Sequence, residues 1–510
     1  MGEQLLCWLL NSLCCALYGP AARRLRQIDD LEAQQRQKLL AQVAANRNTA
    51  FGKAHGFDTI ATVADYQRQV PLRTYDDYLP WIEALLAGEQ NGLTAERVLL
   101  FEPTSGSVSA SKYIPYTAGL RREFQAGLKP WLHDLYTRYP EIRRGKSYWS
   151  VTPVTARDRY SPGGTPIGFE EDSQYFGFLE RWIFDRVFAV PAAAVKGGSL
   201  EDFWFNTALR LLACESLTLI SVWNPTFLLL ILDTLEKRES ELLAALKARS
   251  PRRHGQVAPL LAAGAYTAIW PRLALISCWG DGNAAVTLPE LRRRFPGVRL
   301  QPKGLLATEA FVTLPCGEEA GALLAAESHF FEFLSPGEGR VCLAHQLKAG
   351  ETYEVVVTTA GGLYRYALKD RVRVEGHTGC LPRLSFQGKA ELVSDLFGEK
   401  LSEGFLRQVM AAVAPPPEFY LFAPEGDHYV LYFKGSAVPA IEGALRQNFH
   451  YDYCLQLGQL KPLRLFRLTG DPRREYLEGC AARGQRLGDV KPAVLSLQGG
   501  WDRVFKGEYL

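Results

Sequence analysis

The chain has 510 residues, of which 47% are hydrophobic and 22% charged, so it can build large cores and is not disordered in composition. Its 58 basic and 55 acidic residues leave a net charge of +3, which argues against nucleic acid or an anionic membrane as the main partner. Ten cysteines without a CxxC spacing argue against a zinc ribbon and a disulfide framework. We therefore expect a cytoplasmic protein of two or three domains.

The first expected element is an apolar helix over residues 5–18. The residues before it carry an acid and no base, unlike a signal peptide, and Asn11 and Ser12 interrupt the apolar run. The run is also shorter than the ~20 residues that a membrane-spanning helix needs. We expect a helix packed into a protein core and no membrane span, with membrane association as the alternative.

Residues 19–95 are expected to form helices joined by polar linkers, and strands then alternate with helices in the middle of the chain. The helix after Asn224 and Pro225 has an N-cap and a proline at its first position. The expected strands are 217–222, 273–279 and 298–306, and the expected helices are 225–247 and 288–295. This alternation predicts a mostly parallel sheet covered by helices on both faces.

From about residue 320 the pattern changes to short β-branched or alternating runs. Strands are expected at 340–346, 353–359 and 363–368, with Ala360-Gly361-Gly362 as a hairpin turn. After residue 390 the expected elements are a helix from Ser402, strands at 418–423, 428–434 and 462–468, and a helix at 437–449. The predicted fold class is α/β. A large N-terminal domain, 1–390, combines parallel βαβ sheets with an antiparallel barrel-like subdomain, and a small mobile α+β domain covers 391–510.

The first candidate site is the loop from Thr104 to Lys112, which is rich in hydroxyls and contains a glycine and a lysine. Backbone N–H groups, hydroxyl donors and a lysine charge suit a polyphosphate. The loop is not a Walker A motif, because Ser111 precedes the lysine and Tyr113 follows it. Taken alone, it also fits a serine-rich surface loop.

Three other candidates occur further along the chain. Thr308-Glu309 follows an expected strand, and the carboxyl ends of parallel strands are where such sheets bind ligands. Asp370 closes another expected strand and could accept hydrogen bonds from a ribose diol. Lys491 lies in a tight loop near the C-terminus. Each alone also fits a surface ion pair, a charged turn or a solvated lysine.

In chain order these motifs have the layout of adenylate-forming enzymes, and the chain resembles the Gretchen Hagen family of auxin-responsive acyl-acid amido synthetases. The resemblance runs from about residue 45 to 495. The residues that carry it are Thr104-Ser105-Gly106-Ser107, Lys112-Tyr113-Ile114-Pro115, Gly304-Leu305-Leu306-Ala307-Thr308-Glu309, Gly362-Leu363-Tyr364-Arg365-Tyr366 with Asp370, and Ser394-Asp395 with Glu399-Lys400-Leu401.

The resemblance implies that ATP and a carboxylic acid form an acyl adenylate, from which an amine, typically an amino acid, displaces AMP to give an amide. The expected partners are these small molecules, and the oligomeric state stays open. The resemblance implies Mg²⁺ binding by Glu309. It implies catalytic roles for Lys112, Lys400 and Lys491, and ATP binding by Thr104, Ser105, Gly106, Ser107, Gly280, Thr308, Asp370 and Phe386.

The chain also departs from the family pattern. Val108 and Ala110 interrupt the hydroxyls of the loop, and Lys369 stands before Asp370 where the family has glycine. A serine hydrolase is disfavoured because no G-x-S-x-G motif occurs, and a metal hydrolase because the eight histidines are scattered. Two alternatives stay open: a ligase with a thiol acceptor such as coenzyme A, and an inactive relative that binds its ligands without turnover.

Overall fold

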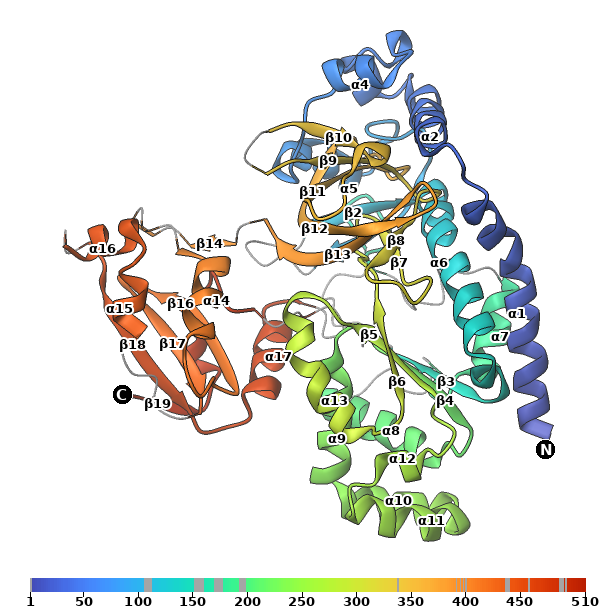
Figure 1. Cartoon of the computed structure of the whole chain (residues 1–510), viewed down its shortest axis with the longest axis vertical. Coiled ribbons are helices and arrows are strands. Elements are labelled where there is room, and N and C mark those ends of the chain that lie inside the picture. Colours follow the sequence, from blue (N-terminus) through green and yellow to red (C-terminus); the bar gives the residue numbers. More distant parts are fainter. Residues whose placement is uncertain are drawn as a thin grey trace. The chain divides into compact units, whose positions relative to one another are not determined.

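The structure is a computed structural model of the 510-residue chain. It describes residues 2–104, 112–150, 160–168, 178–191, 199–336, 339–390, 392–394, 396–397, 399, 401–435, 441–456, 459–485, 490 and 493–510. By its internal contacts the chain divides into two compact units, and the division falls between Gly388 and Lys389. Figure 1 shows both units.

The N-terminal helix, α1 (Gly2–Arg26), is longer than expected. By length and composition it is apolar enough to cross a membrane, so the sequence argument that it is too short for a span was wrong. The expectation of core packing is confirmed on one face, since Cys7, Leu10, Cys14 and Tyr18 are buried in a cluster that includes residues of α6 (Ala118–Arg138) and α7 (Phe178–Val187).

Short helices follow α1, as expected for residues 19–95. Polar side chains fix where these helices begin: Asp30, Thr49 and Thr62 each accept a backbone N–H of the first turn. The helices are α2 (Leu31–Asn46), α3 (Ala50–Ala54), α4 (Val63–Gln69) and α5 (Leu79–Leu86). A hairpin of β1 (Val98–Thr104) and β2 (Lys112–Thr117) comes next and leads into α6 (Ala118–Arg138).

The predicted parallel sheet is confirmed, with strands in the order β3-β4-β5-β6. Its strands are β3 (Lys146–Trp149), β4 (Leu217–Ser221), β5 (Leu275–Trp279) and β6 (Arg299–Lys303). Helices lie on both sides of it (Figure 1), with α1, α6 and α7 (Phe178–Val187) on one side and α8 (Leu200–Ala213), α9 (Pro225–Lys237) and α13 (Leu288–Arg294) on the other.

The helix expected over 225–247 is two helices, because α9 ends at Lys237 and α10 (Glu239–Arg249) begins after Arg238. Asn224 caps α9 as predicted, accepting the backbone N–H of Thr226 at 3.0 Å. Two further helices, α11 (Pro251–Ala262) and α12 (Tyr266–Ile269), lead to β5.

The region after residue 310 forms the expected antiparallel sheet, in the order β10-β9-β11-β12-β13-β8-β7. Its strands are β7 (Thr313–Leu314), β8 (Ala322–Leu324), β9 (Phe330–Leu334), β10 (Val341–Leu343), β11 (Thr352–Thr358), β12 (Tyr366–Thr378) and β13 (Leu381–Lys389). The strand expected at 363–368 was misplaced, because β12 begins only at Tyr366 and runs on to Thr378. The strand expected at 340–346 is also shorter, since residues 344–346 form a 3₁₀ turn.

The second unit is an α+β fold around one sheet in the order β16-β17-β18-β19. The sheet strands are β16 (Phe419–Glu425), β17 (His428–Lys434), β18 (Lys461–Leu468) and β19 (Gly507–Tyr509), and β14 (Val393–Ser394) pairs with β15 (Leu401–Ser402). The helices are α14 (Glu403–Ala411), α15 (Ile441–Leu445), α16 (Phe449–Gln456) and α17 (Pro472–Ala482). Within the described residues, the helix expected over 437–449 is only α15, and α16 begins where that helix was expected to end. Residues 436–440 lie outside the described ranges.

Candidate functional site

Tyr366, the first residue of β12, connects two of the predicted site residues. Its hydroxyl donates to Glu309 Oε1 at 3.4 Å. Burial raises the pKa of Tyr366 well above its ordinary value, and the negative charges of Glu309 and Asp370 and the phenol of Tyr75 raise it further. Tyr366 therefore bonds to Glu309 and lies within electrostatic reach of Asp370, which is 61 positions further along the chain than Glu309.

A tight turn after β6 presents Thr308 and Glu309. The turn is closed by hydrogen bonds between Ala307 and Ala310, whose backbone N–H and C=O groups bond each other at 2.9 and 3.2 Å. The Tyr116 hydroxyl donates to the Thr308 carbonyl at 3.0 Å, which connects the turn to β2. Glu309 thus lies at a fixed turn past the carboxyl end of a parallel strand, as predicted.

Asp370 lies inside β12 rather than closing a strand, which corrects the sequence interpretation. The pairing of β11 with β12 shifts register between Glu354 and Val356, so extra residues of β12 bulge at this point. Lys369 has φ of 56°, in the left-handed region, and the Asp370 side chain after it is only 2% exposed. The bulge therefore turns the aspartate inward, and Lys369 occupies a backbone position that favours glycine.

Replacing Lys369 with glycine should leave the site intact and stabilise the fold by up to about 1 kcal/mol, because it removes a left-handed lysine. Urea denaturation of the purified variant measures the change. As a control, glycine at the exposed Arg373 of the same strand should destabilise instead, since that position has ordinary strand geometry. A loss of stability in Lys369→Gly would contradict the strain argument.

Lys112 begins β2, and its Nζ lies 5.2 Å from the centre of the Tyr75 ring. The Tyr75 hydroxyl is held by β2, because it accepts the Tyr113 N–H at 2.7 Å and lies 3.4 Å from the Tyr113 carbonyl. Burial raises the pKa of Tyr75 to about 12, and the charge of Glu309 adds to the effect. Lys112, Tyr75 and Glu309 therefore belong to the same neighbourhood as Tyr366.

The hydroxyls of Tyr75 and Tyr366 can donate hydrogen bonds to an anionic ligand that binds near Glu309. A phenol is protonated at neutral pH, and the raised pKa values of both side chains extend this state to more alkaline pH. They are hydrogen-bond donors next to a lysine, and they add no negative charge beside Glu309 and Asp370. The arrangement combines two carboxylates, one ammonium group and two hydroxyl donors within the first unit.

Phe386 contacts the two residues that follow Gly280, which are Asp281 and Gly282. The Phe386 N–H donates to Asp281 Oδ2 at 3.0 Å, and the Phe386 ring packs against Gly282. Burial raises the pKa of the Asp281 carboxyl, and the charge of Glu375 adds to this. A side chain at Gly280 would come within 2.7 Å of Pro302, so this close approach of β5 and β6 requires glycine.

Several predicted site residues fall outside the described part of the chain. These are Ser105, Gly106, Ser107, Lys400 and Lys491. The backbone of Thr104 is described and pairs with Lys112 at the end of the β1–β2 hairpin. Their assigned roles therefore stay predictions.

Sequence reasoning missed Tyr75 and Asp281. Tyr75 reaches the site because Arg73, two residues before it, pairs with the start of β12: the Arg73 N–H donates to the Arg365 carbonyl at 3.0 Å, and the Ala367 N–H donates to the Arg73 carbonyl at 2.8 Å. No local sequence pattern predicts this pairing between Arg73 and β12, which are almost 300 positions apart. The sequence Gly280-Asp281-Gly282 is typical of a turn, but it does not indicate that Asp281 accepts a hydrogen bond from the distant strand β13.

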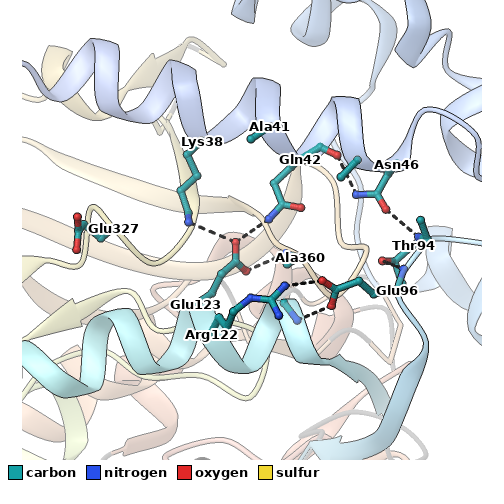
Figure 2. Close-up of a pocket in the computed structure, with 13 residues that line it drawn as sticks. Lys38, Ala41, Gln42, Asn46, Thr94, Glu96, Arg122, Glu123, Glu327 and Ala360 are labelled. Atoms are coloured by element: carbon teal, nitrogen blue, oxygen red, sulfur yellow. Dashed lines mark hydrogen bonds and ion pairs between the residues drawn. The ribbon is translucent and has the colours of Figure 1, made fainter. Parts of the chain in front are cut away.

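A separate pocket of about 390 Å³ lies between α2 and α6, and Figure 2 shows its lining. No predicted site residue that the structure describes lines it. Its central group is the buried Glu123 carboxylate, which accepts from Gln42 at 2.9 Å and from the Ala360 N–H at 2.8 Å. His329 Nδ1 lies 2.9 Å from this carboxylate and Lys38 Nζ lies 3.6 Å from it. These contacts join α2, α6 and the antiparallel sheet, so Glu123 stabilises the fold.

Burial by itself would raise the pKa of Glu123, but His329, Lys38 and the N–H donors outweigh it and hold the pKa below the ordinary value of 4.5. A depressed carboxyl pKa contributes stability that is complete above about pH 4.5 and is lost as the pH falls through the folded-state pKa. Glu123→Gln should lower the free energy of unfolding by about 3 kcal/mol at neutral pH. The difference from wild type should shrink below pH 4.5 in urea titrations.

The exposed Glu83→Gln variant is the matched control for this pH series, and it should follow wild type throughout. A constant difference between Glu123→Gln and wild type across the acid range would contradict the assigned pKa direction.

Comparison with known proteins identifies the family. Residues 23–256 match the GH3 (Gretchen Hagen) family N-terminal domain, and residues 322–389 match the GH3 family central domain. A putative indole-3-acetic acid-amido synthetase of Oryza sativa subsp. japonica is 22% identical over 468 residues, covering 85% of this chain and 94% of that protein. An indole-3-acetic acid-amido synthetase of Arabidopsis thaliana is 21% identical over 460 residues, covering 80% and 82%.

A solved structure agrees with this assignment at the level of the fold. The acyl acid amido synthetase AtGH3.15, solved in complex with 2,4-DB, superposes with a TM-score of 0.79 at 16% identity. The superposition covers 97% of this chain and 95% of that one, so the predicted fold class is confirmed over nearly the whole length.

Proposed function

This chain belongs to the GH3 family, and on that premise we propose that it is an ATP-dependent acyl-acid amido synthetase. The carboxylate of an organic acid attacks the α-phosphorus of ATP and releases pyrophosphate, which leaves an acyl adenylate. An amine, in our proposal an amino acid, then attacks the acyl carbon and releases AMP. The products are an amide, AMP and pyrophosphate.

The observation that carries this proposal is the surroundings of Tyr366, which donates a hydrogen bond to Glu309 and lies within electrostatic reach of Asp370. We assign Asp370 to the ribose hydroxyls, since a carboxylate accepts hydrogen bonds from both members of a diol. We assign Thr308, Gly280 and Phe386 to the nucleotide pocket. The ring of Phe386, beside the side-chain-free Gly282, is suited to stack on adenine.

The chemistry requires positive charge, because it brings a carboxylate onto a triphosphate. We assign this task to Lys112 and, from the resemblance to the family, to Lys400 and Lys491. The loop residues Thr104, Ser105, Gly106 and Ser107 would hold the phosphates through N–H and hydroxyl donors. No covalent protein nucleophile is needed, since the work is orientation and charge stabilisation.

Glu309 fits a magnesium ion that is shared with the nucleotide. Mg²⁺ prefers hard oxygen ligands and is typically bound by one or two carboxylates together with substrate phosphates. The described residues hold no group of three or more histidine, cysteine, aspartate or glutamate side chains that would form an all-protein metal site. Mg²⁺ would supply charge that offsets the phosphate oxygens, and the Glu309 carboxylate at its turn would hold it.

The acceptor is tested by product analysis. The purified chain is incubated with ATP, Mg²⁺, a panel of carboxylic acids that includes indole-3-acetic acid, and either mixed amino acids or coenzyme A. Mass spectrometry should find an acyl–amino acid conjugate with AMP in equal amount, and no thioester. A thioester without amide would assign the thiol-acceptor alternative, and absence of AMP with every acid would favour an inactive binding protein.

A further inference from the structure

Helix α1 has two apolar faces, and within the described part of the chain only one of them is covered by protein. At about 100° per residue, the buried side chains Cys7, Leu10, Asn11, Cys14 and Tyr18 fall on one side of the helix. The opposite side carries a ridge of leucines spaced by four: Leu5, Leu9, Leu13 and Leu17, which are 58%, 52%, 43% and 45% exposed. Leu6 and Trp8, also exposed, widen this ridge.

This apolar face, defined by Leu5, Leu6, Trp8, Leu9, Leu13 and Leu17, is unusual for the molecule. It holds six of the fourteen large apolar side chains that are exposed in the described part of the chain. A helix that is apolar all round is normally covered on every side. A contiguous exposed patch of this kind marks a binding surface for a protein or a membrane.

The inner side of α1 shows that the helix lies on the protein and does not leave it. Asn11 donates to the Arg143 carbonyl at 3.0 Å, and its side-chain oxygen accepts from Tyr136 at 3.3 Å. Glu3 lies 3.2 Å from Lys146 Nζ and accepts from Ser216 at 3.1 Å. Crossing a bilayer would expose these polar groups to hydrocarbon, whereas lying flat on its surface keeps them paired.

The chemistry of the outer face favours lipid over a protein partner. Apart from the Trp8 indole, every side chain exposed between Leu5 and Leu17 is a leucine or an alanine. Protein interfaces carry about one hydrogen bond per 100–200 Å², and this face offers almost no group to make one. An exposed tryptophan, Trp182, occurs on α7, which packs against α1, and the Arg186 guanidinium stacks on its ring at 3.8 Å. Tryptophan and arginine are enriched at bilayer surfaces.

The positive charge at the C-terminal end of α1 indicates that this face would bind anionic lipids. The last turns carry Arg23, Arg24 and Arg26, all exposed, and by helical spacing Arg24 lies on the same side as Leu6 and Leu17. Arg24 lies 3.5 Å from Glu327 and Arg26 lies 3.9 Å from Asp134, but their side chains stay 60% and 55% exposed. Exposed arginines that continue an apolar face are placed to contact anionic headgroups. This helix also begins ahead of the family match, which starts at residue 23, so the surface is outside the part that the family domains cover.

We propose that the apolar face of α1 binds the surface of an anionic lipid bilayer, with the helix lying in the plane of the headgroups. The leucines and Trp8 enter the acyl boundary, and the arginines contact the headgroups. The inner face stays packed on α6, so binding leaves the candidate active site unchanged. The protein is then a peripheral membrane protein through this helix.

The test is flotation of the full-length chain, with its purification tag at the C-terminus, on two kinds of vesicle. One is phosphatidylcholine alone, and the other contains about one-third phosphatidylglycerol. Wild type should float with the anionic vesicles. Leu9→Glu/Leu13→Glu should lower binding at least about tenfold, because two leucines leave the acyl boundary. Leu510→Glu, at an exposed leucine of the second unit, is the matched control and should bind as wild type does.

Circular dichroism melting should show the double variant folded, because both substituted side chains face solvent. Binding that survives the double substitution, or no binding by wild type, overturns the proposal. Equal binding to both vesicles overturns the role of the arginines. Light scattering tests the alternative that a second copy of the chain covers this face. If wild type is a dimer that does not bind lipid, and the Leu9→Glu/Leu13→Glu variant is a monomer, the face is a dimer interface.

Discussion

Glu309→Gln is expected to lower acid-dependent ATP–pyrophosphate exchange by about 10²–10³-fold, the typical effect of removing one group that stabilises transition-state charge. Glutamine preserves the size of the side chain and an oxygen for the Tyr366 hydroxyl, while it removes the charge that would hold Mg²⁺. Because Glu309 lies half-exposed at a turn, the fold should be unaffected.

A control variant and a Mg²⁺ titration test whether the effect of Glu309→Gln comes from weakened metal binding. The exposed Glu318→Gln variant, in the same unit, should exchange at the wild-type rate. Raising the Mg²⁺ concentration should restore part of the activity of Glu309→Gln, since weakened metal binding is overcome by mass action. Exchange at the wild-type rate in Glu309→Gln would remove this residue from the proposed metal site.

Asp370→Ala is expected to raise the KM for ATP by about 100-fold, since two charge-assisted hydrogen bonds to the ribose would be lost. Asp370 is buried, so a change of stability could accompany the substitution. A nucleotide comparison separates the two effects. Wild type should prefer ATP over 2′-deoxy-ATP in kcat/KM, and the variant should lose that preference. A variant that still discriminates between the two nucleotides would place the ribose elsewhere.

Some elements could be predicted because their signals are local. Strand β17 matches its expected bounds, His428–Lys434, since a β-rich run is delimited by turn residues. Helix α9 begins where Asn224 and Pro225 indicate, because a cap and a first-turn proline act within three residues. The end of this helix at Lys237 could not be predicted from the sequence, because residues 239–247 are equally good helix formers.

The antiparallel region shows where local signals fail. Ala360-Gly361-Gly362 indicates a turn, but the connection runs on to Arg365, where a positive φ of 48° and a buried ion pair with Glu332 at 2.9 Å hold the backbone. The bulge at Lys369 likewise depends on the register against β11. A charged turn was the natural interpretation of Lys369-Asp370-Arg371, and only tertiary pairing places the aspartate inside a strand.

In the candidate site, too, the sequence predicts some residues, and others could be found only from the tertiary structure. Lys112, Glu309 and Asp370 could be predicted from ordered motifs, and the structure gathers them around two tyrosines. Tyr75 could not, because it arrives through the pairing of Arg73 with Tyr366. The tyrosines matter for the chemistry, because their protonated hydroxyls are hydrogen-bond donors near the carboxylates.

The most direct test of the acyl-adenylate mechanism follows the oxygen of the substrate. An acid labelled with oxygen-18 in its carboxylate is converted in the presence of ATP and the amine that product analysis has identified, and AMP and pyrophosphate are examined by mass spectrometry. The mechanism predicts one labelled oxygen in each AMP and none in pyrophosphate, because the carboxylate oxygen stays on the α-phosphorus when the amide forms. Label in inorganic phosphate together with ADP, or unlabelled AMP, would contradict it.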